Sequence, residues 1–250
     1  MTFTSVKMIQ NATIIASENA YFARHETFHP RSGWLKKGFN AVTKNQEIFS
    51  LPDAHILLGV GKNMATAIKY WCSAYKLISS AKKLSTESTN GFYPTEFGNL
   101  LLGDNGWDPW LENPASLWLL HWNLLKTPSQ ATAWHFIFNE LRKTEFTTDD
   151  LQAELRNFRD KTGLNVADSS LHKDLLCILR MYAGQEAENQ AKKNVGEESL
   201  ECPFVELGII QRTEDSKYYQ FRQGSKPNLP AEVIVAVCLD YINTLAPGQK

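Results

Sequence analysis

The segment from residue 53 to residue 78 constrains the fold more than any other, because it has the pattern of two helices joined by a tight glycine turn. Asp53 suits the N-cap of a short helix over 54–58, and Gly59-Val60-Gly61 is then the turn. From residue 62 onwards, apolar residues recur at the spacing of a longer amphipathic helix. Those residues are Met64, Ala67, Ile68, Trp71, Ala74, Tyr75 and Ile78. A short helix, a glycine-containing turn and a longer helix are the plan of a helix-turn-helix.

Further helices and strands are predicted on both sides of this segment. Capping residues and prolines set several boundaries, such as Thr147 or Thr148 before one helix, Gly163 after it and Ser169 before the next. The predicted helices cover 34–42, a start at 94–97, 114 to about 127, 131–143, 148–162, 169–183 and 231–245. The predicted strands cover 205–210 and 218–221, residues 79–91 are a loop or a wing, and residues 184–201 are a linker.

Three helices followed by a hairpin are the order of a winged helix, and this order occurs twice. The sequence therefore predicts a mainly α fold with two winged-helix-like units, each a helix-turn-helix plus a short β-hairpin, and a Trp-rich helical connection. The expected organisation is a lead-in over 1–20, a basic helix-turn-helix domain with an aromatic helical extension over 21–126, and a second winged-helix-like domain over 131–245. The end after Pro247-Gly248 leaves a longer parent protein open.

Positive and negative residues are unevenly distributed, although the formal charge of the chain is only −1 at pH 7. Residues 21–83 hold ten Lys and Arg against three Asp and Glu, whereas residues 96–201 hold ten against seventeen. A basic first half favours a polyanion as the partner, and an acidic remainder limits non-specific binding. The alternative is an internal contact between the two halves.

The sequence favours a protein that neither spans a membrane nor is secreted. The longest apolar runs are far too short to cross a bilayer, and the first fifteen residues lack the pattern of a signal peptide. The four cysteines are widely spaced and include no CxxC pair. We therefore expect a cytoplasmic protein with reduced, buried thiols and no membrane partner.

Residues 25–29 spell His-Glu-Xaa-Xaa-His, the zinc signature of a class of metalloproteases. That site needs both histidines one helical turn apart, but Pro30 disfavours helical backbone at His29, and no third ligand follows at a typical spacing. The sequence thus argues against a metalloprotease. His25, Glu26 and His29 are nevertheless the candidate catalytic residues, because they could act on a phosphate as acid, base or metal ligand. The alternative is that His29 fixes the turn at Pro30.

The longer helix after the glycine turn is the candidate reader of double-stranded DNA. At its N-terminus, Lys62 and the backbone N–H groups suit a phosphate, and the amide of Asn63 suits an adenine edge. Thr66 and Lys69 extend the same polar face. A solvated helix face is the alternative, and the glycine turn lacks the spacing of a nucleotide-binding phosphate loop. The other predicted DNA-binding residues are Arg24, Arg31, Lys36 and Lys37.

Five of the seven tryptophans lie between residues 107 and 134, in acidic surroundings that favour a core over a base-stacking platform. Asp104, Asp108 and Glu112 in the same stretch are predicted to be turn and cap residues. Their alternative role is to hold Mg²⁺ or Mn²⁺ for phosphodiester chemistry. The sequence assigns no definite metal ligands.

Several long motifs in the first half together resemble a known family. They are Phe22-Ala23-Arg24-His25-Glu26-Thr27-Phe28-His29-Pro30-Arg31, Gly33-Trp34-Leu35-Lys36-Lys37-Gly38, Leu58-Gly59-Val60-Gly61-Lys62-Asn63-Met64, Pro94-Thr95-Glu96-Phe97-Gly98, Gly106-Trp107-Asp108-Pro109 and Leu117-Trp118-Leu119-Leu120-His121-Trp122. They resemble the SspB-like family of bacterial DNA phosphorothioation systems, an uncharacterised-domain family encoded beside PAPS-reductase-like proteins. The match is dense over residues 20–125 and only general in the second half.

The resemblance implies a DNA-binding protein that nicks one strand for sulfur insertion. It would act with a cysteine desulfurase, a sulfurtransferase-like ATP pyrophosphatase and an ATPase, and the sulfur would mark self DNA for anti-phage defence. No motif of the family assigns a nicking nucleophile or a metal site to a residue of this chain. Two other functions stay open from the residues alone, a winged-helix transcription regulator without catalytic activity and an adaptor that docks an acidic protein.

Overall fold

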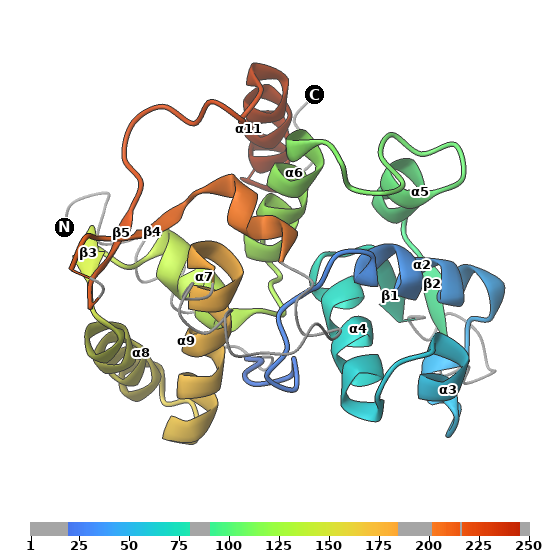
Figure 1. The fold of residues 1–250 in the computed structure, drawn as a ribbon, viewed down its shortest axis with the longest axis horizontal. Helices are drawn as coiled ribbons and strands as arrows, with labels where there is room; N and C mark the ends of the chain where they lie inside the picture. The colour runs from blue at the N-terminus through green and yellow to red at the C-terminus, as the bar shows by residue number, and fades with distance from the viewer. Residues whose placement is uncertain (1–19, 81–90, 185–201, 216, 246–250) are drawn as a thin grey trace.

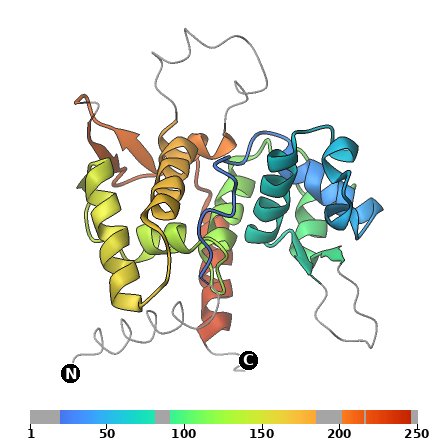
Figure 2. The ribbon, with the colours of Figure 1, turned by 90° about the horizontal axis from the view of Figure 1, so that it is seen from below.

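The computed structural model describes residues 20–80, 91–184, 202–215 and 217–245, and it is mainly helical with short strands. Figure 1 shows two groups of elements with a pair of helices, α6 (Pro114–Leu125) and α11 (Ala231–Leu245), between them. Figure 2, from below, again places α11 in the middle of the molecule. This general character agrees with the predicted mainly α fold.

The first group contains the predicted helix-turn-helix segment. Its helices are α2 (Trp34–Lys44), η1 (Ile48–Ser50), α3 (Ala54–Leu58), α4 (Lys62–Ala74) and α5 (Glu96–Leu102). Strands β1 (Ile78–Ser80) and β2 (Phe92–Pro94) pair antiparallel between α4 and α5. The predicted loop over 79–91 therefore begins with the last two residues of β1 and stops just before β2, and its residues 81–90 lie outside the described ranges.

Helix α4 ends four residues earlier than the predicted helix over 62–78. Lys76 has a left-handed backbone with φ of 59°, and its N–H donates to the carbonyl of Ser73. The N–H of Leu77 then donates to the carbonyl of Cys72, which completes a Schellman helix end. This motif usually has glycine at the left-handed position, so a lysine there gave no stop signal in the sequence.

The second group combines a three-stranded sheet with three helices. The elements are α7 (Thr132–Asn139), β3 (Glu145–Phe146), α8 (Thr148–Thr162), α9 (Asp168–Ala183), η3 (Pro203–Leu207), β4 (Ile210–Arg212) and β5 (Tyr219–Phe221). The sheet order is β3-β5-β4, with both pairs antiparallel.

Several predicted boundaries of the second group are confirmed and others are wrong. Thr147 caps α8 through a reciprocal bond pair with Asp150, and Gly163 ends the helix. Ala167, not Ser169, precedes α9, and helix α7 ends at Asn139 rather than at residue 143. The predicted strand over 205–210 is mostly η3, because Pro203 starts a turn of 3-10 helix and β4 begins only at its end. The predicted linker over 184–201 lies almost wholly outside the described ranges.

One continuous apolar core extends through both groups and α6. Trp71 of α4 meets Trp134 of α7 edge to face at 5.5 Å, and Tyr75 stacks on Phe204 at 5.1 Å. Three of the four free cysteines are buried as predicted, but Cys238 on α11 is exposed. Within the described ranges, every helix is too short or too polar to span a lipid bilayer. The predicted division into domains over 21–126 and 131–245 stays a prediction, and the core crosses it.

Candidate nucleic-acid interface

The N-terminal half of α4 presents a polar face to solvent. Lys62, Asn63 and Thr66 are exposed, and Lys69 is half-buried with its ammonium nitrogen 5.0 Å from the ring centroid of Phe92. We call the side chains of Lys62, Asn63, Thr66 and Lys69 the α4 face. The first turn of α4 carries no acidic residue, so its N–H groups and helix dipole add positive potential to that of the lysines. The arrangement suits a phosphate at this helix end.

A pocket of about 960 Å³ lies beside the α4 face, between α4, the β1–β2 hairpin and the segments around residues 21–24 and 128–130. We call it the α4 pocket. Thr66, Lys69 and Ser73 line it from α4, at intervals that place them on one side of the helix. Among the described residues, its walls include three cationic side chains and no Asp or Glu. The polar face of the helix therefore continues into a cationic cavity.

The cations of the α4 pocket are Arg24, Lys69 and Lys76. Arg24 is exposed, whereas Lys76 is half-buried and donates to the carbonyls of Asn123 and Lys126, each at 2.6 Å. Burial and, to a smaller extent, the charge of Lys126 lower the pKa of Lys76 to about 8, and Asp240 partly opposes them. Lys76 is still mainly protonated at pH 7, so all three side chains are positive there.

His25, the first of the candidate catalytic residues, is fully buried in a pair with Asp174 of α9. Its Nε2 lies 2.8 Å from Oδ1 of Asp174, and the backbone N–H of Ala23 donates to the same oxygen at 2.8 Å. The imidazole also stacks on Trp71 and meets Trp134 edge-on. These contacts tie the segment before α2 to α9. A side chain with no exposed surface is not placed to touch a phosphate, and its catalytic role stays a prediction.

Glu26 and His29 lie in a turn rather than in a helix. Glu26 and Thr27 both have left-handed backbone, with φ of 49° and 67°. His25 and His29 are therefore not stacked one helical turn apart, in keeping with the helix-breaking effect expected of Pro30. Glu26 is exposed, and His29 is half-buried with Nδ1 3.4 Å from the carbonyl oxygen of Pro30. Burial lowers the pKa of His29, so its imidazole is neutral at pH 7.

The predicted DNA-binding residues of α2 and the segment before it differ in exposure. Arg24 and Lys37 are exposed. Arg31 is buried, with its guanidinium over two aromatic rings at 5.2 and 5.5 Å from their centroids. Lys36 is also buried and donates to the carbonyl of Leu102 at 2.6 Å. Both residues are thus engaged within the fold, and neither is directed to a surface that DNA could reach in this conformation.

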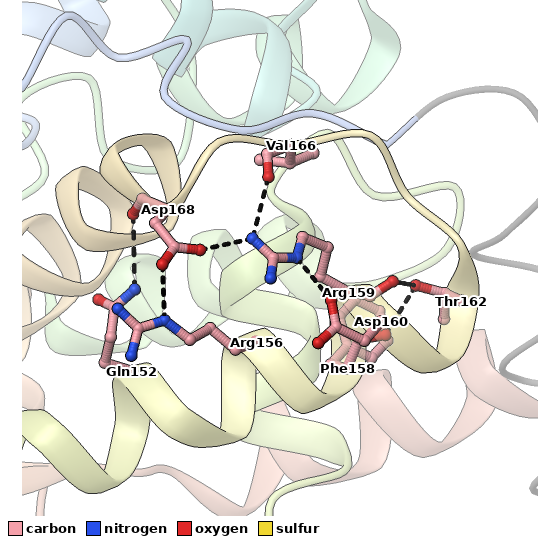
Figure 3. Close-up of polar contacts among 8 residues, drawn as sticks. All are labelled: Gln152, Arg156, Phe158, Arg159, Asp160, Thr162, Val166 and Asp168. Atoms are coloured by element: carbon pink, nitrogen blue, oxygen red, sulfur yellow. Dashed lines mark hydrogen bonds and ion pairs between the residues drawn. The ribbon is translucent and has the colours of Figure 1, made fainter.

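The N-terminus of α9 offers a useful contrast with that of α4. Asp168, in the first turn of α9, accepts from Arg156 Nε at 2.8 Å and also from Arg159, as Figure 3 shows. Arg159 additionally donates to Asp160 and to the carbonyl of Val166 (Figure 3). The two arginines are therefore neutralised by neighbouring carboxylates. The cations of the α4 face and Arg24 form no ion pair with a carboxylate of the described residues.

The acidic stretch before α6 forms a turn. Asp108 accepts from the N–H groups of Glu112 and Asn113 at 3.0 and 2.9 Å and so acts in a turn, whereas Asn113 is the N-cap of α6. In the parts of the chain that are described, no three His, Cys, Asp or Glu side chains gather closely enough to hold a metal ion. The tryptophans of this region are divided, because Trp134 is buried whereas Trp107 and Trp110 are 64% and 70% exposed.

Residues 22–249 match the family described as Protein of unknown function (DUF4007). The chain belongs to this family. Two solved structures are similar over nearly its whole length. A magnesium ion-bound SspB crystal structure has 37% identity and a TM-score of 0.82, covering 93% of this chain and 69% of that one. A second SspB crystal structure has 36% identity and a TM-score of 0.81, with coverage of 94% and 69%. No curated protein matches. The predicted SspB-like family is confirmed.

Two features of the interface were missed by sequence reasoning. The α4 pocket draws on residues separated by more than a hundred positions, from Tyr21 to Gln130, and no local pattern links them. The His25–Asp174 pair spans 149 positions in the same way. One signal was available in the sequence: Asp174 directly precedes Leu175 and Leu176 and occupies a position of the apolar pattern of α9, where an aspartate needs a partner.

Proposed function

We propose that this chain is a DNA-binding component of a bacterial DNA phosphorothioation and anti-phage defence system. The likeness to SspB at 37% identity over 93% of the chain supports the system. The DNA partner is carried by one observation, the α4 face that leads into a pocket lined by Arg24, Lys69 and Lys76, with no carboxylate among its described lining residues. Lys62 at the helix N-terminus, together with these cations farther along, is a suitable surface for a phosphate backbone.

The docking mode follows from the order of the elements. We propose that helices α2, α3 and α4 and the β1–β2 hairpin act as a winged helix, in which the second helix of the helix-turn-helix enters the major groove. In that pose α4 reads the groove with Asn63 near its N-terminus, and Lys62 and Arg24 neutralise phosphates on either side. The second group has the order α7, β3, α8, α9, β4, β5, and we propose that it is a second winged helix. Its helix α9 is not proposed to contact DNA.

Strand nicking and the protein partners belong to the same proposal. Glu26 and His29 are the candidate catalytic side chains that retain exposed or partly exposed surface. The described residues do not provide a three-ligand metal site, so we assign no step to Mg²⁺ or Mn²⁺. Partner proteins would be the sulfurtransferase-like ATP pyrophosphatase and the ATPase of the system. A plain transcription regulator would share the DNA-binding surface and lack nicking.

Binding is tested with a duplex titrated at several salt concentrations. Contacts from Arg24, Lys37, Lys62 and Lys69 with about four phosphates give a slope of log K against log salt of about −3 to −4. Lys62→Glu should weaken binding about tenfold and make the slope shallower by about 1. Lys173→Glu, an exposed lysine on α9, is the matched control and should leave both unchanged. Equal effects of the two variants would contradict the assignment to α4.

Nicking is tested separately with supercoiled plasmid and either Mg²⁺ or Mn²⁺. Open-circle product that is lost in His29→Ala, with duplex affinity and melting temperature unchanged, supports a catalytic role for His29. If the same change lowers melting temperature and affinity together, His29 fixes the turn at Pro30. Binding by the wild-type protein with no nicking in either metal leaves the regulator as the function.

A further inference from the structure

We infer that the α4 pocket receives one unpaired nucleotide of a DNA strand, with its base against the aromatic walls and its phosphate among the three cations. The inference rests on the proposed DNA-binding function and names what this part of the surface takes.

The walls of the α4 pocket suit a nucleobase. Tyr21, Tyr70, Phe92 and Tyr93 contribute aromatic rings from three separate segments of the chain. A volume of about 960 Å³ holds one nucleotide with room for solvent and is far too small for a duplex. An aromatic ring can stack on any of the bases, because every base has a π-face. An unpaired base is therefore the chemical group that fits these walls.

The charges of the pocket suit a phosphate. Arg24, Lys69 and Lys76 line the pocket from different segments, and none of the described lining residues is acidic. The ammonium of Lys76 uses two of its three N–H groups on the carbonyls of Asn123 and Lys126, which fix its position. One N–H is left for a ligand. Hydroxyl groups of Thr66, Ser73, Ser79, Ser80 and Thr95 add neutral donors around the cations.

The position of the pocket explains how a strand would reach it. Thr66 and Lys69 belong both to the α4 face and to the pocket lining, so the two surfaces are continuous. A DNA strand bound along α4 would therefore reach the pocket directly. Enzymes that act on a nucleotide commonly take it out of the stack, and a nucleotide that is already unpaired does so at the lowest cost. The pocket should therefore prefer DNA that contains an unpaired nucleotide.

The test compares a fully paired duplex with the same duplex carrying one bulged 2-aminopurine. The wild-type protein should bind the bulged duplex about tenfold tighter, within the range that stacking of one base supplies, and should change its 2-aminopurine fluorescence. Ser73→Trp fills the pocket from α4 and should abolish both effects while keeping affinity for the paired duplex within about twofold. Ser169→Trp, at an exposed position of α9, is the control and should behave as wild type. If Ser73→Trp melts early, Tyr93→Ser removes an aromatic wall instead.

Three results would overturn the inference. Equal affinity of the wild-type protein for both duplexes would show that the pocket does not take an unpaired nucleotide, although DNA binding itself stands. Free 2′-deoxyadenosine 5′-monophosphate that binds as tightly as the bulged duplex would make a free nucleotide the ligand. No binding of either duplex at low salt would refute the proposed function, and with it the DNA strand as the source.

Discussion

Removal of the Asp174 carboxylate tests whether the His25–Asp174 pair stabilises the fold. Asp174 is 1% exposed, and its Oδ1 accepts from both His25 and the backbone N–H of Ala23. Asp174→Ala leaves two buried polar groups without a partner. Loss of one member of a buried pair costs about 3–5 kcal/mol in the free energy of unfolding. A chain of this size loses about 2–4 °C in melting temperature per kcal/mol, so we expect a fall of about 6–20 °C.

Two controls isolate the cause of that fall. Asp174→Asn keeps an oxygen acceptor for Ala23 and His25 and should cost only about 1–2 kcal/mol, because a neutral hydrogen bond replaces a charge-assisted one. Asp168→Ala removes a carboxylate from the N-terminus of α9. Its side chain is 50% exposed, and because exposed ion pairs contribute little to stability, this variant should melt close to wild type. Thermal unfolding followed by near-ultraviolet circular dichroism ranks the three variants.

The same experiment decides between structure and chemistry at His25. A melting temperature of Asp174→Ala within about 2 °C of wild type would refute the argument from burial. A His25→Ala protein that melts normally but no longer nicks DNA would refute it as well, because the imidazole would then be free to act on a phosphate. We expect instead that His25→Ala and Asp174→Ala lower the melting temperature to a similar extent.

Three further predictions concern residues outside the His25–Asp174 pair. Burial lowers the pKa of His121 to about 3. The neutral imidazole therefore contributes fully to stability above about pH 6.5, and this contribution is lost as pH falls toward 3, by at most about 5 kcal/mol. Urea unfolding at several pH values should show that the free energy of unfolding depends less on pH in His121→Phe. Lys36→Ala should lower the melting temperature, whereas Lys37→Ala should weaken DNA binding without doing so, as calorimetry and a binding titration would show. Asn63→Ala should reduce discrimination between target and scrambled duplexes by about 1–3 kcal/mol, as measured by competition binding.

Local signals predicted most of the helices. The limits of α3 and α11 and the start of α4 agree with the predicted ones, because caps, glycine turns and prolines act over a few residues. The end of α4 was missed because Lys76 adopts a left-handed backbone that sequence rules reserve for glycine. Strand β3 was missed because its two residues gain their partner, β5, only from a segment more than seventy positions away.

Exposure of the candidate site residues was predicted less well than their helices. Arg31 and Lys36 are charged residues in a basic run, and a solvated surface is the usual place for them. Arg31 packs over the nearby rings of Phe28 and Trp34, and Lys36 donates to the distant carbonyl of Leu102, contacts that charge patterning does not reveal. The polar side of α4 was predicted correctly, because helical periodicity alone separates it from the apolar side that contains Ile68 and Trp71.

Charge placement, more than element order, distinguishes the two groups of this molecule. Each group leads from helices into a short antiparallel hairpin, so topology alone would make α4 and α9 equivalent candidates. The N-terminus of α9 carries Asp168, which occupies Arg156 and Arg159 and leaves little net potential for a phosphate. The N-terminus of α4 carries Lys62 and no acid, and its face leads into a cationic pocket. The charges around the two helices are therefore the reason that we propose DNA binding at α4 and not at α9.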